Sequence, residues 1–397
     1  MTMTTAIMMT TIAIMTAIAI TIITTIIATI AITAAKRSIP NKNQRQVTCS
    51  DGRLKVKESL SRKDIHQSMS LSICFTIIYR GHNIFCARFS QLRLERFKQK
   101  VKKRWDPMST SQESKVVAYY EAAGTDYRRY WFSPANLAMH FGYYDSTVKS
   151  HGTSLLKMNE VLASFAAISP DDQVLDAGCG YGGSAIWLAK NRGCQVVGIN
   201  LVPEQVSAAR RFAKTSGVED RVSFAEMNFT ATTFPDESFD VVWALESLVH
   251  SDKKEAFFRE AYRLLRGGGR LIIADYTLRE SPALSSDQKT TLTPWLKGWA
   301  LADLLATSEY IQALQASGFQ KVETRDITEQ IRPSVNWLGK LHLPTWPTAD
   351  IVAAIGRVAC RIGLYNDIRL HGIEAGICQN RALRAGLWRY TLLRVQK

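Results

Sequence analysis

The chain has 397 residues, enough for one large or two medium domains with a hydrophobic core. Its formal net charge of +15 suggests an anionic partner, but residues 36–107 carry 18 Lys and Arg against only 5 Asp and Glu. Residues 108–397 carry 32 basic against 30 acidic residues, so we expect no nucleic-acid partner for this part. Seven cysteines without a C-x-x-C spacing favour a reduced compartment over a disulfide framework. No His, Cys and carboxylate cluster has metal-ligand spacing, so we expect no metal site.

Residues 1–35 contain only Thr, Ile, Ala and Met, which makes them a low-complexity extension. Their length and lack of charge would also allow a membrane-spanning helix flanked by Lys36 and Arg37. A secretory signal needs a basic start and a mitochondrial presequence needs early arginines, and this stretch has neither.

Residues 36–107 are rich in basic residues, which predicts a disordered, solvated arm with one apolar patch at 70–79. We expect residues 1–107 to lie outside the functional unit and residues 108–397 to form that unit. The alternative for the extension is a plastid-type transit segment. The expected location is cytoplasmic, with a membrane-associated or organellar location as the alternative if the extension is retained.

The functional part opens with a helical pattern after Met108 and a dense set of aromatics, YYEAAGTDYRRYW from Tyr119 and HFGYYD at 140–145. Such aromatics fill cores more often than they line sites. They could also face a cationic ligand, since aromatic rings attract cations. Among them we predict Tyr143 as a ligand contact.

The run DDQVLDAGCGYGGSAIWLAK at 171–190 predicts a strand, a glycine turn and a helix. Gly178, Gly180 and Gly182 let the backbone turn tightly against a ligand, and the helix N-terminus points at that ligand. Gly178, Gly180 and Gly183 also satisfy G-x-G-x-x-G, the dinucleotide pattern. Asp176 argues against that alternative, because its carboxylate at the strand end would repel a pyrophosphate and attract an ammonium group.

The text VLDAGCGYGG resembles the first motif of class I S-adenosylmethionine-dependent methyltransferases. This resemblance implies S-adenosylmethionine as cofactor. It also implies that the early aromatics belong to cap helices that close over the cofactor, as in small-molecule methyltransferases. An NAD-dependent oxidoreductase remains the competing enzyme class.

Two further strands, 195–199 and 222–226, end on Asn200 and lead to Asn228. The run GINLVPEQ resembles tocopherol, sterol and cyclopropane-forming methyltransferases, which implies that Asn200 and Gln205 hold the ribose. The same resemblance places Asn228 at the adenine. The amide oxygen of Asn228 can accept a hydrogen bond from the adenine amino group. Leu201 and Phe229 beside these residues, and Ala244 directly after the next strand, complete the predicted cofactor contacts.

The fourth strand, 239–243, leads into Ala244, Glu246 and His250. Ligands of parallel α/β sheets bind beyond the carboxyl ends of the strands, so Glu246 and His250 should face the methyl acceptor. His250 could take a proton from an attacking hydroxyl or amine, or it could cap the helix that starts near Asp252. The region resembles tocopherol-type and plant alkaloid N-methyltransferases, in which a Glu and a His at this spacing contact the substrate.

Asp275 is predicted to end the fifth strand, 270–274, where it either faces the same crevice or caps the next segment of the chain. The remaining pattern predicts helices at 284–317, 348–363 and 374–385, a sixth strand at 319–325 and a last strand at 387–395. The resemblance implies a Rossmann-like sheet of seven mostly parallel strands, an antiparallel last strand, helices on both faces and a helical cap over the acceptor pocket. That cap comprises 108–165, 284–317 and 348–385.

These patterns predict methyl transfer from S-adenosylmethionine to a hydroxyl of a hydrophobic small molecule such as a secondary metabolite, a prenylquinol or a terpenoid-like compound. N- or C-methylation of a similar acceptor is the first alternative. The second is a protein that binds the cofactor without catalysis, or a membrane-tethered scaffold that uses residues 1–107. We predict His250, Glu246 and Asp275 as the catalytic residues.

Overall fold

The computed structural model describes residues 46–50, 53–57, 72–79, 82–90, 111–127, 131, 133–280, 284–342, 357, 360 and 367–397. Its internal contacts divide the chain into two compact units, Met1–Arg96 and Phe97–Lys397. The predicted low-complexity extension 1–35 lies outside the described residues, as does most of the helix predicted at 348–363. No helix in the described part of the chain is long and apolar enough to span a bilayer.

In the first unit the structure describes two strand pairs within the basic segment. Strand β1 (Gln46–Ser50) pairs antiparallel with β2 (Arg53–Lys57), and β3 (Ser72–Tyr79) pairs antiparallel with β4 (His82–Ser90). The expectation of disorder for residues 36–107 did not foresee these strands. The apolar patch predicted at 70–79 coincides with β3, whose β-branched and aromatic residues favour an extended backbone.

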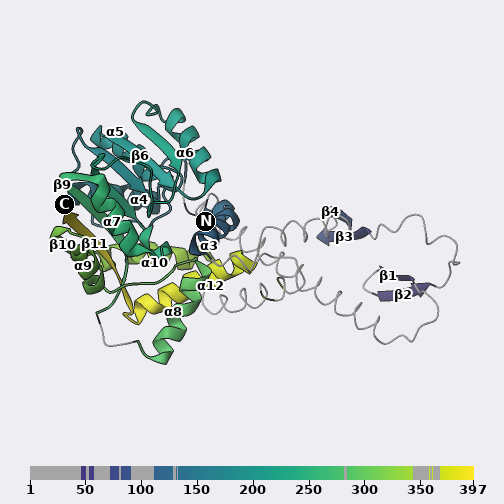
Figure 1. Ribbon diagram of the computed structural model, residues 1–397. Helices are drawn as coiled ribbons and strands as arrows, with labels where there is room; N and C mark the ends of the chain where they lie inside the picture. Colours follow the sequence, from purple (N-terminus) through teal and green to yellow (C-terminus); the bar gives the residue numbers. More distant parts are fainter. Residues whose placement is uncertain are drawn as a thin grey trace. The chain divides into compact units, whose positions relative to one another are not determined.

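The second unit is built on a seven-stranded sheet in the order β10-β11-β9-β8-β5-β6-β7 (Figure 1). Strands β5 to β9 run parallel to one another, and β11 is antiparallel to both of its neighbours. The strands are β5 (Gln173–Ala177), β6 (Gln195–Asn200), β7 (Val222–Glu226), β8 (Phe239–Leu245), β9 (Leu265–Leu278), β10 (Gln320–Asp326) and β11 (Trp388–Gln396). This arrangement confirms the predicted fold class.

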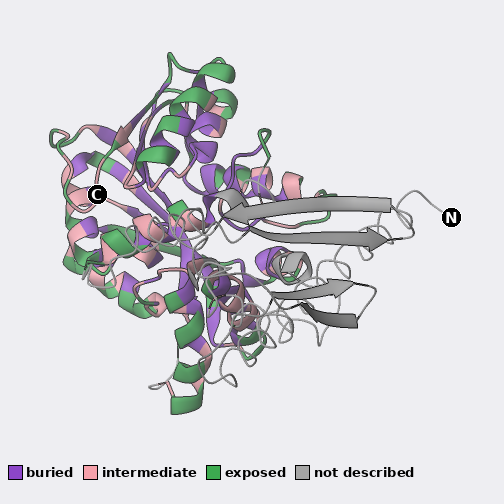
Figure 2. Cartoon of the chain, turned by 90° about the vertical axis from the view of Figure 1, so that its right-hand side faces the viewer, coloured by how far each residue is buried: buried purple, intermediate pink, exposed green. Residues whose placement is uncertain are grey.

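Helices cover both faces of the sheet, because parallel central strands such as β8 are buried on both sides. One face packs against α4 (His151–Phe165), α5 (Gly183–Arg192), α6 (Pro203–Thr215), α10 (Thr328–His342) and α12 (Asp367–Arg384). The other face packs against α7 (Lys254–Leu264) and α9 (Thr307–Ala316). Figure 2 shows the burial concentrated on the strands and on the inward sides of these helices.

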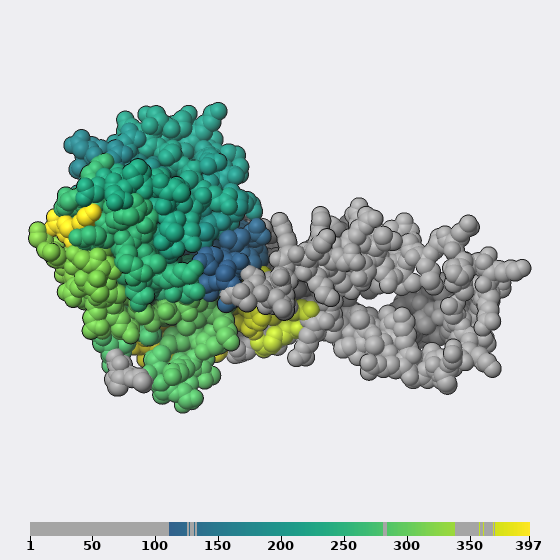
Figure 3. Space-filling model, viewed as in Figure 1, coloured from purple at the N-terminus to yellow at the C-terminus, as the bar shows by residue number. Residues whose placement is uncertain are grey.

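Two further helices stand at the carboxyl ends of the strands. Helix α3 (Gln112–Asp126) contacts α12 and the short 3₁₀ turn η2 (Leu248–His250) that follows β8. Helix α8 (Ser286–Gly298) packs along α12. In the space-filling view α3 is the blue surface between the teal half of the sheet domain and the yellow-green C-terminal helix (Figure 3).

Three details differ from the sequence predictions. Helix α10 was not predicted, and Pro333 inside it explains why, since proline normally breaks a helix. The segment 284–317, predicted as one helical part of the cap, contains the two helices α8 and α9. Tyr310 on α9 is fully buried in the core on the face of the sheet that packs against α7 and α9. Strand β9 extends beyond Ala274 to Leu278, because it pairs with β11 from Arg270 to Leu278.

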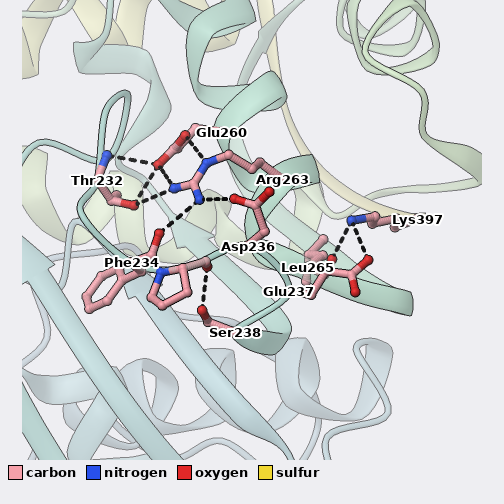
Figure 4. A network of polar contacts seen from close by, with 10 residues as sticks. Thr232, Phe234, Asp236, Glu237, Ser238, Glu260, Arg263, Leu265 and Lys397 are labelled. Carbon is pink, nitrogen blue, oxygen red and sulfur yellow. Dashed lines mark hydrogen bonds and ion pairs between the residues drawn. The ribbon is translucent and has the colours of Figure 1, made fainter.

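The loop after β7 is held by a compact polar network (Figure 4). Arg263 on α7 donates to the Phe234 carbonyl at 2.9 Å and pairs with Asp236 at 2.5 Å. Glu260 pairs with Arg263 at 2.7 Å and accepts hydrogen bonds from both the backbone and the hydroxyl of Thr232. The motif FPDES is therefore anchored to α7, which fixes the loop that leaves β7.

Candidate active site

The glycine turn between β5 and α5 has the geometry of a ligand cradle. Gly178, Gly180 and Gly182 all have positive φ angles of 94°, 53° and 82°, which side chains rarely tolerate. A Cβ at Gly178 would lie 2.5 Å from the Cβ of Ser247 at the end of β8. Only glycine lets the two strand ends approach so closely.

A cavity of about 980 Å³, its open mouth included, lies over this cradle at the carboxyl ends of the strands. Its walls come from α3, the segment before α4, the cradle, and the residues that follow β6, β7 and β8. This is the place where open parallel sheets bind their ligands. Ten predicted site residues line it: Asp176, Gly178, Gly180, Asn200, Leu201, Gln205, Asn228, Phe229, Glu246 and His250.

Four predicted site residues do not line this cavity. Gly182 faces Phe224 and Ala209 in the core, and Ala244 is fully buried among core residues. The backbone N–H of Tyr143 donates to Ser154, and its ring packs against the core. Asp275 is fully buried within β9.

Asp176 presents a free carboxylate oxygen. The side chain is 2% exposed, and its Oδ2 atom has no hydrogen-bond partner among the described residues. Burial raises the pKa of Asp176 to about 7, while a hydrogen bond from the backbone of Ala185 acts in the opposite direction. An unpaired buried carboxylate is costly, so this position suits a ligand that brings an ammonium group.

Asn200 and Gln205 form one polar unit at the end of β6. Asn200 Nδ2 donates to Gln205 Oε1 at 2.6 Å, and Asn200 Oδ1 accepts from the backbone of Leu201 at 2.9 Å. Gln205 Nε2 points to the sulfur of Met139 at 3.7 Å. The pair stands where the carboxylate of related folds meets the ribose, and its amides offer both donors and acceptors.

Asn228 uses its amide oxygen within the protein. Oδ1 accepts hydrogen bonds from the backbone and the hydroxyl of Thr230, both at 2.9 Å. The predicted contact of this oxygen with an adenine amino group would therefore have to share it with Thr230. The neighbouring Phe229 lines the cavity and packs edge-on against Phe257.

His250 lies in the cavity wall with both ring nitrogens engaged. Nδ1 lies 3.1 Å from the carbonyl oxygen of Ala300, which can only accept, so Nδ1 carries the hydrogen. Nε2 is then an acceptor and receives the hydroxyl hydrogen of Tyr120 at 2.9 Å. Burial lowers the pKa of His250 to about 4, so the ring is neutral near pH 7.

Glu246 follows β8 in a left-handed backbone conformation with a φ of 50°. Its Oε1 accepts from the backbone of Phe141 at 2.7 Å and from the hydroxyl of Tyr390 at 2.8 Å, and its Oε2 accepts from the hydroxyl of Tyr276. Burial raises the pKa of Glu246 to about 7 although these hydrogen bonds lower it.

Asp275 binds the backbone of the turn that carries His250. Its Oδ2 accepts from the backbone of Val249 at 3.1 Å, and its Oδ1 accepts from the backbone of Tyr276 at 3.0 Å. Burial and the nearby charge of Glu246 raise the pKa of Asp275 to about 8. Asp275 does not line the cavity, which corrects the prediction that it faces the crevice; it holds the turn η2 on which His250 stands.

Some cavity residues were not predicted. Tyr120 was noted only as one of several aromatics, and Ser247 and His140 were not singled out although both line the cavity. The sequence signal for His140 was its place in HFGYYD, directly before Phe141 and Gly142. The described part of the chain contains no group of three or more metal-ligating side chains.

Comparison with known proteins identifies the family. A family model described as a methyltransferase domain matches residues 175–273. Ajmaline N-methyltransferase of Rauvolfia serpentina is 30% identical over 240 residues, which cover 57% of this chain and 80% of that protein. A probable chloroplastic tocopherol O-methyltransferase of Oryza sativa subsp. japonica is 29% identical over 273 residues, 65% of this chain and 74% of that protein.

The fold agrees with this assignment. The crystal structure of the [4+2]-cyclase SpnF superposes on this structure with a TM-score of 0.58 and 22% sequence identity. The match covers 72% of this chain and 97% of the SpnF chain. The close-packed glycine cradle and the unpaired oxygen of Asp176 fit the methionine end of S-adenosylmethionine, which carries an ammonium group. The chain belongs to the S-adenosylmethionine-dependent methyltransferases of small molecules, and S-adenosylmethionine is its cofactor.

Proposed function

We propose that the protein transfers a methyl group from S-adenosylmethionine to a hydroxyl group of a hydrophobic small molecule. Secondary metabolites, prenylquinols and terpenoid-like compounds are the proposed acceptor classes. The bound cofactor supplies an electrophilic methyl group on a sulfonium. One observation carries the proposal: a neutral imidazole acceptor, Nε2 of His250, lies in the wall of the cavity that contains the cradle.

His250 is the proposed general base. A hydroxyl that gains a methyl group must lose its proton as charge develops, and a positioned acceptor of that proton lowers the barrier. Nδ1 remains tied to the Ala300 carbonyl, so the ring keeps its orientation while Nε2 receives the proton. An acceptor hydroxyl that displaces the hydroxyl of Tyr120 from Nε2 would sit in line for this transfer.

Apolar residues in the cavity wall support a lipophilic acceptor. Val116, Tyr120, Leu137 and Leu245 contribute apolar surface to the cavity. Trp295, which lies in the predicted cap segment 284–317, is fully buried in the core and does not line the cavity. The acceptor chemistry is therefore set by α3 and the strand ends rather than by the middle of α8.

The names of relatives favour neither oxygen nor nitrogen, because one is an O-methyltransferase and the other an N-methyltransferase. We favour a hydroxyl because Nε2 already receives one hydroxyl group, that of Tyr120. N- and C-methylation of a similar acceptor are the alternatives. A protein that binds the cofactor without methyl transfer is a further one, and the similar fold of a cyclase shows that the fold alone does not fix the reaction.

A matched pair of acceptors tests the proposal. The full chain is incubated with S-adenosylmethionine and either a lipophilic hydroquinone or an amine on the same hydrocarbon skeleton. Product mass and release of S-adenosylhomocysteine are measured. Methylation of the hydroquinone oxygen, lost in His250→Ala, supports the proposal. Methylation of only the amine, or of a carbon, contradicts the hydroxyl assignment, and cofactor binding without any product from a wide acceptor panel supports the non-catalytic alternative.

We also propose that residues 108–397 form the catalytic unit in the cytoplasm and that residues 1–107 are an extension to it. In support, all the described residues that line the cavity lie at position 112 or later. The contacts of the chain divide a little earlier, between Arg96 and Phe97.

A further inference from the structure

Residues 136–142 form a strap that lies directly on the glycine cradle. A Cβ at Gly183, the first residue of α5, would lie 2.7 Å from the carbonyl oxygen of Leu137 and 2.8 Å from that of Asn136. A Cβ at Gly180 would lie 3.3 Å from the sulfur of Met139. Four consecutive strap residues line the cavity, namely Leu137, Ala138, Met139 and His140. Any ligand in the cradle therefore lies against the strap.

The strap is fastened at both ends by hydrogen bonds. At its start, Asn136 Oδ1 accepts from the backbone of Ser133 at 3.1 Å and from that of Ala138 at 3.4 Å. At its end, Phe141 donates its N–H to Glu246 at 2.7 Å and Gly142 donates its N–H to Ser334 at 3.0 Å. Of the two acceptors at this end, Glu246 lines the cavity and Ser334 does not.

The strap also stores backbone strain. Leu137 has a φ of 48°, a left-handed conformation that is unfavourable for a leucine. Glu246 has the same kind of conformation at the other end of the contact. Both residues must be held in place by surrounding contacts, because neither conformation is favourable by itself.

The carboxylate of Glu246 is committed to protein donors. It accepts three hydrogen bonds, from the backbone of Phe141 and from the hydroxyls of Tyr276 and Tyr390. None of the ion pairs in the described part of the chain includes it. A carboxylate engaged in this way acts as a structural anchor rather than as a free contact for an acceptor.

The backbone of Phe141 connects Glu246 to the side chain of His140. Its N–H goes to Glu246, and its carbonyl oxygen accepts from Nδ1 of His140 at 2.9 Å. The hydrogen on Nδ1 leaves Nε2 of His140 as an acceptor, and this atom has no partner among the described residues although the side chain is only 6% exposed. A buried acceptor without a donor is costly, and a ligand in the cavity can supply that donor.

We propose that Glu246 is a positioning residue of the cofactor site: it holds the strap on the cradle through Phe141 and so sets the affinity for the cofactor. Through the same residue it fixes the ring of His140, whose Nε2 accepts a hydrogen bond from the bound ligand. This inference rests on the cofactor and is independent of the atom that is methylated. It differs from the sequence prediction, in which Glu246 contacts the acceptor.

Calorimetric binding of S-adenosylhomocysteine to the full chain tests the proposal without turnover. Glu246→Ala removes the anchor and is expected to weaken binding about tenfold or more. Glu246→Gln keeps an oxygen for the N–H of Phe141 and can donate to a tyrosine hydroxyl, so its affinity is expected to stay within about threefold of the wild type. Tyr390→Phe is the matched control, because it removes another bond to the same oxygen and leaves Phe141 bound.

Two results would overturn the proposal. One is wild-type affinity in Glu246→Ala together with a raised KM for the acceptor, which would mean that Glu246 contacts the acceptor. The other is equal weakening in Glu246→Gln and Glu246→Ala, which would mean that the charge matters rather than the hydrogen bond to the strap. If circular dichroism shows that Glu246→Ala is unfolded, Glu246→Asp carries the test, because its carboxylate is one methylene too short for Phe141 and aspartate tolerates the left-handed backbone.

His140 is tested in the same assay. His140→Phe keeps the ring volume and removes the acceptor, and it is expected to weaken binding of S-adenosylhomocysteine several-fold. His151→Phe is its control, since His151 is a neighbouring histidine that does not line the cavity. Unchanged affinity in His140→Phe would exclude His140 as a ligand contact. The role of Glu246 would then be decided by the Glu246 variants alone.

Discussion

Tyr120 on α3 donates its hydroxyl hydrogen to Nε2 of His250 on η2 over 2.9 Å, although 130 residues separate the two along the chain. The bond joins the N-terminal cap to the carboxyl end of the central strand β8 at the proposed base. It also shows that Nε2 can receive a hydroxyl group at this point of the cavity. The hydroxyl of the proposed acceptor takes the place of the Tyr120 hydroxyl at Nε2 of His250.

The neutral state of His250 predicts an unusual pH dependence. Because burial lowers its pKa to about 4, the unprotonated form of the ring is already fully populated throughout the neutral range. At saturating cofactor, we expect the protonation of this base to leave kcat unchanged between pH 6 and 8. A rate that is half-maximal near pH 6.5 would show instead that the ring is solvated in the working complex.

Replacement of the base should separate catalysis from binding. His250→Ala is expected to lower kcat by about 10²-fold or more, with little change in the affinity for S-adenosylhomocysteine. His371→Ala on the exposed side of α12 is the control histidine. A wild-type rate in His250→Ala would remove His250 from the mechanism.

Loss of the Tyr120 hydroxyl should affect stability more than turnover. Tyr120→Phe leaves a buried acceptor nitrogen without its donor, which is expected to lower the free energy of unfolding by about 1–3 kcal/mol in urea titrations. Turnover should remain within a few-fold, because the acceptor hydroxyl replaces Tyr120 in any case. Tyr144→Phe is matched, since it removes a similar tyrosine bond to His151 at 3.2 Å away from the cavity lining. A loss of turnover as large as in His250→Ala would place Tyr120 in the proton transfer.

The local parts of this fold were predictable from sequence. The strand before Gly178 is a short apolar run, and the positive φ angles of the glycines follow from the residue type itself. Strands β6 and β7 likewise begin at their predicted positions, because their hydrophobic pattern marks them.

The partners of the polar side chains could not be predicted in this way. Glu246 meets the backbone of Phe141, 105 residues earlier, and the sequence around Glu246 contains no sign of this. Asp275 was expected at a strand end, but the pairing of β9 with β11 buries it inside the sheet. Tertiary packing decided both positions, and local pattern carried no information about it.

The buried carboxylate of Asp176 predicts how ligand binding depends on pH. Its pKa in the folded protein is about 7, so the ionised form that attracts an ammonium group is populated only as the pH rises through that value. Affinity for S-adenosylhomocysteine should therefore increase between pH 6 and 8. Asp176→Asn should bind about tenfold or more weakly at pH 8 and show a flatter profile. A wild-type affinity that falls over this range would contradict an ionic role for Asp176.

The same shift predicts an effect on the free protein. Because the folded pKa of Asp176 lies above its unfolded value, the folded state binds more protons between about pH 4 and 7. Its contribution to stability is present at low pH and lost as the pH rises through 7. The free energy of unfolding without ligand should fall less from pH 6 to 8 in Asp176→Asn than in the wild type, and an identical slope would show that Asp176 is solvated.

Removal of residues 1–107 is expected to leave cofactor binding and turnover intact. A chain that begins at Met108 keeps all the described residues that line the cavity, so its affinity for S-adenosylhomocysteine and its turnover should match those of the full chain within about twofold. Equilibrium binding and steady-state rates of the two chains provide the comparison. Loss of binding in the shorter chain would show that residues 1–107 belong to the functional unit.

The contact between the strap and α5 predicts a large effect from one methyl group. Gly183 has an ordinary helical backbone, so alanine would by itself favour the helix. Its Cβ would, however, lie 2.7 Å from the carbonyl oxygen of Leu137, and the strained strap cannot yield there without leaving the cradle. Gly183→Ala is therefore expected to lower the free energy of unfolding by about 1–3 kcal/mol and to weaken binding of S-adenosylhomocysteine. Gly267→Ala is the control, because nothing lies within 4 Å of the added carbon. Gly183→Ala with wild-type binding and greater stability would show that the strap does not rest on the cradle in solution.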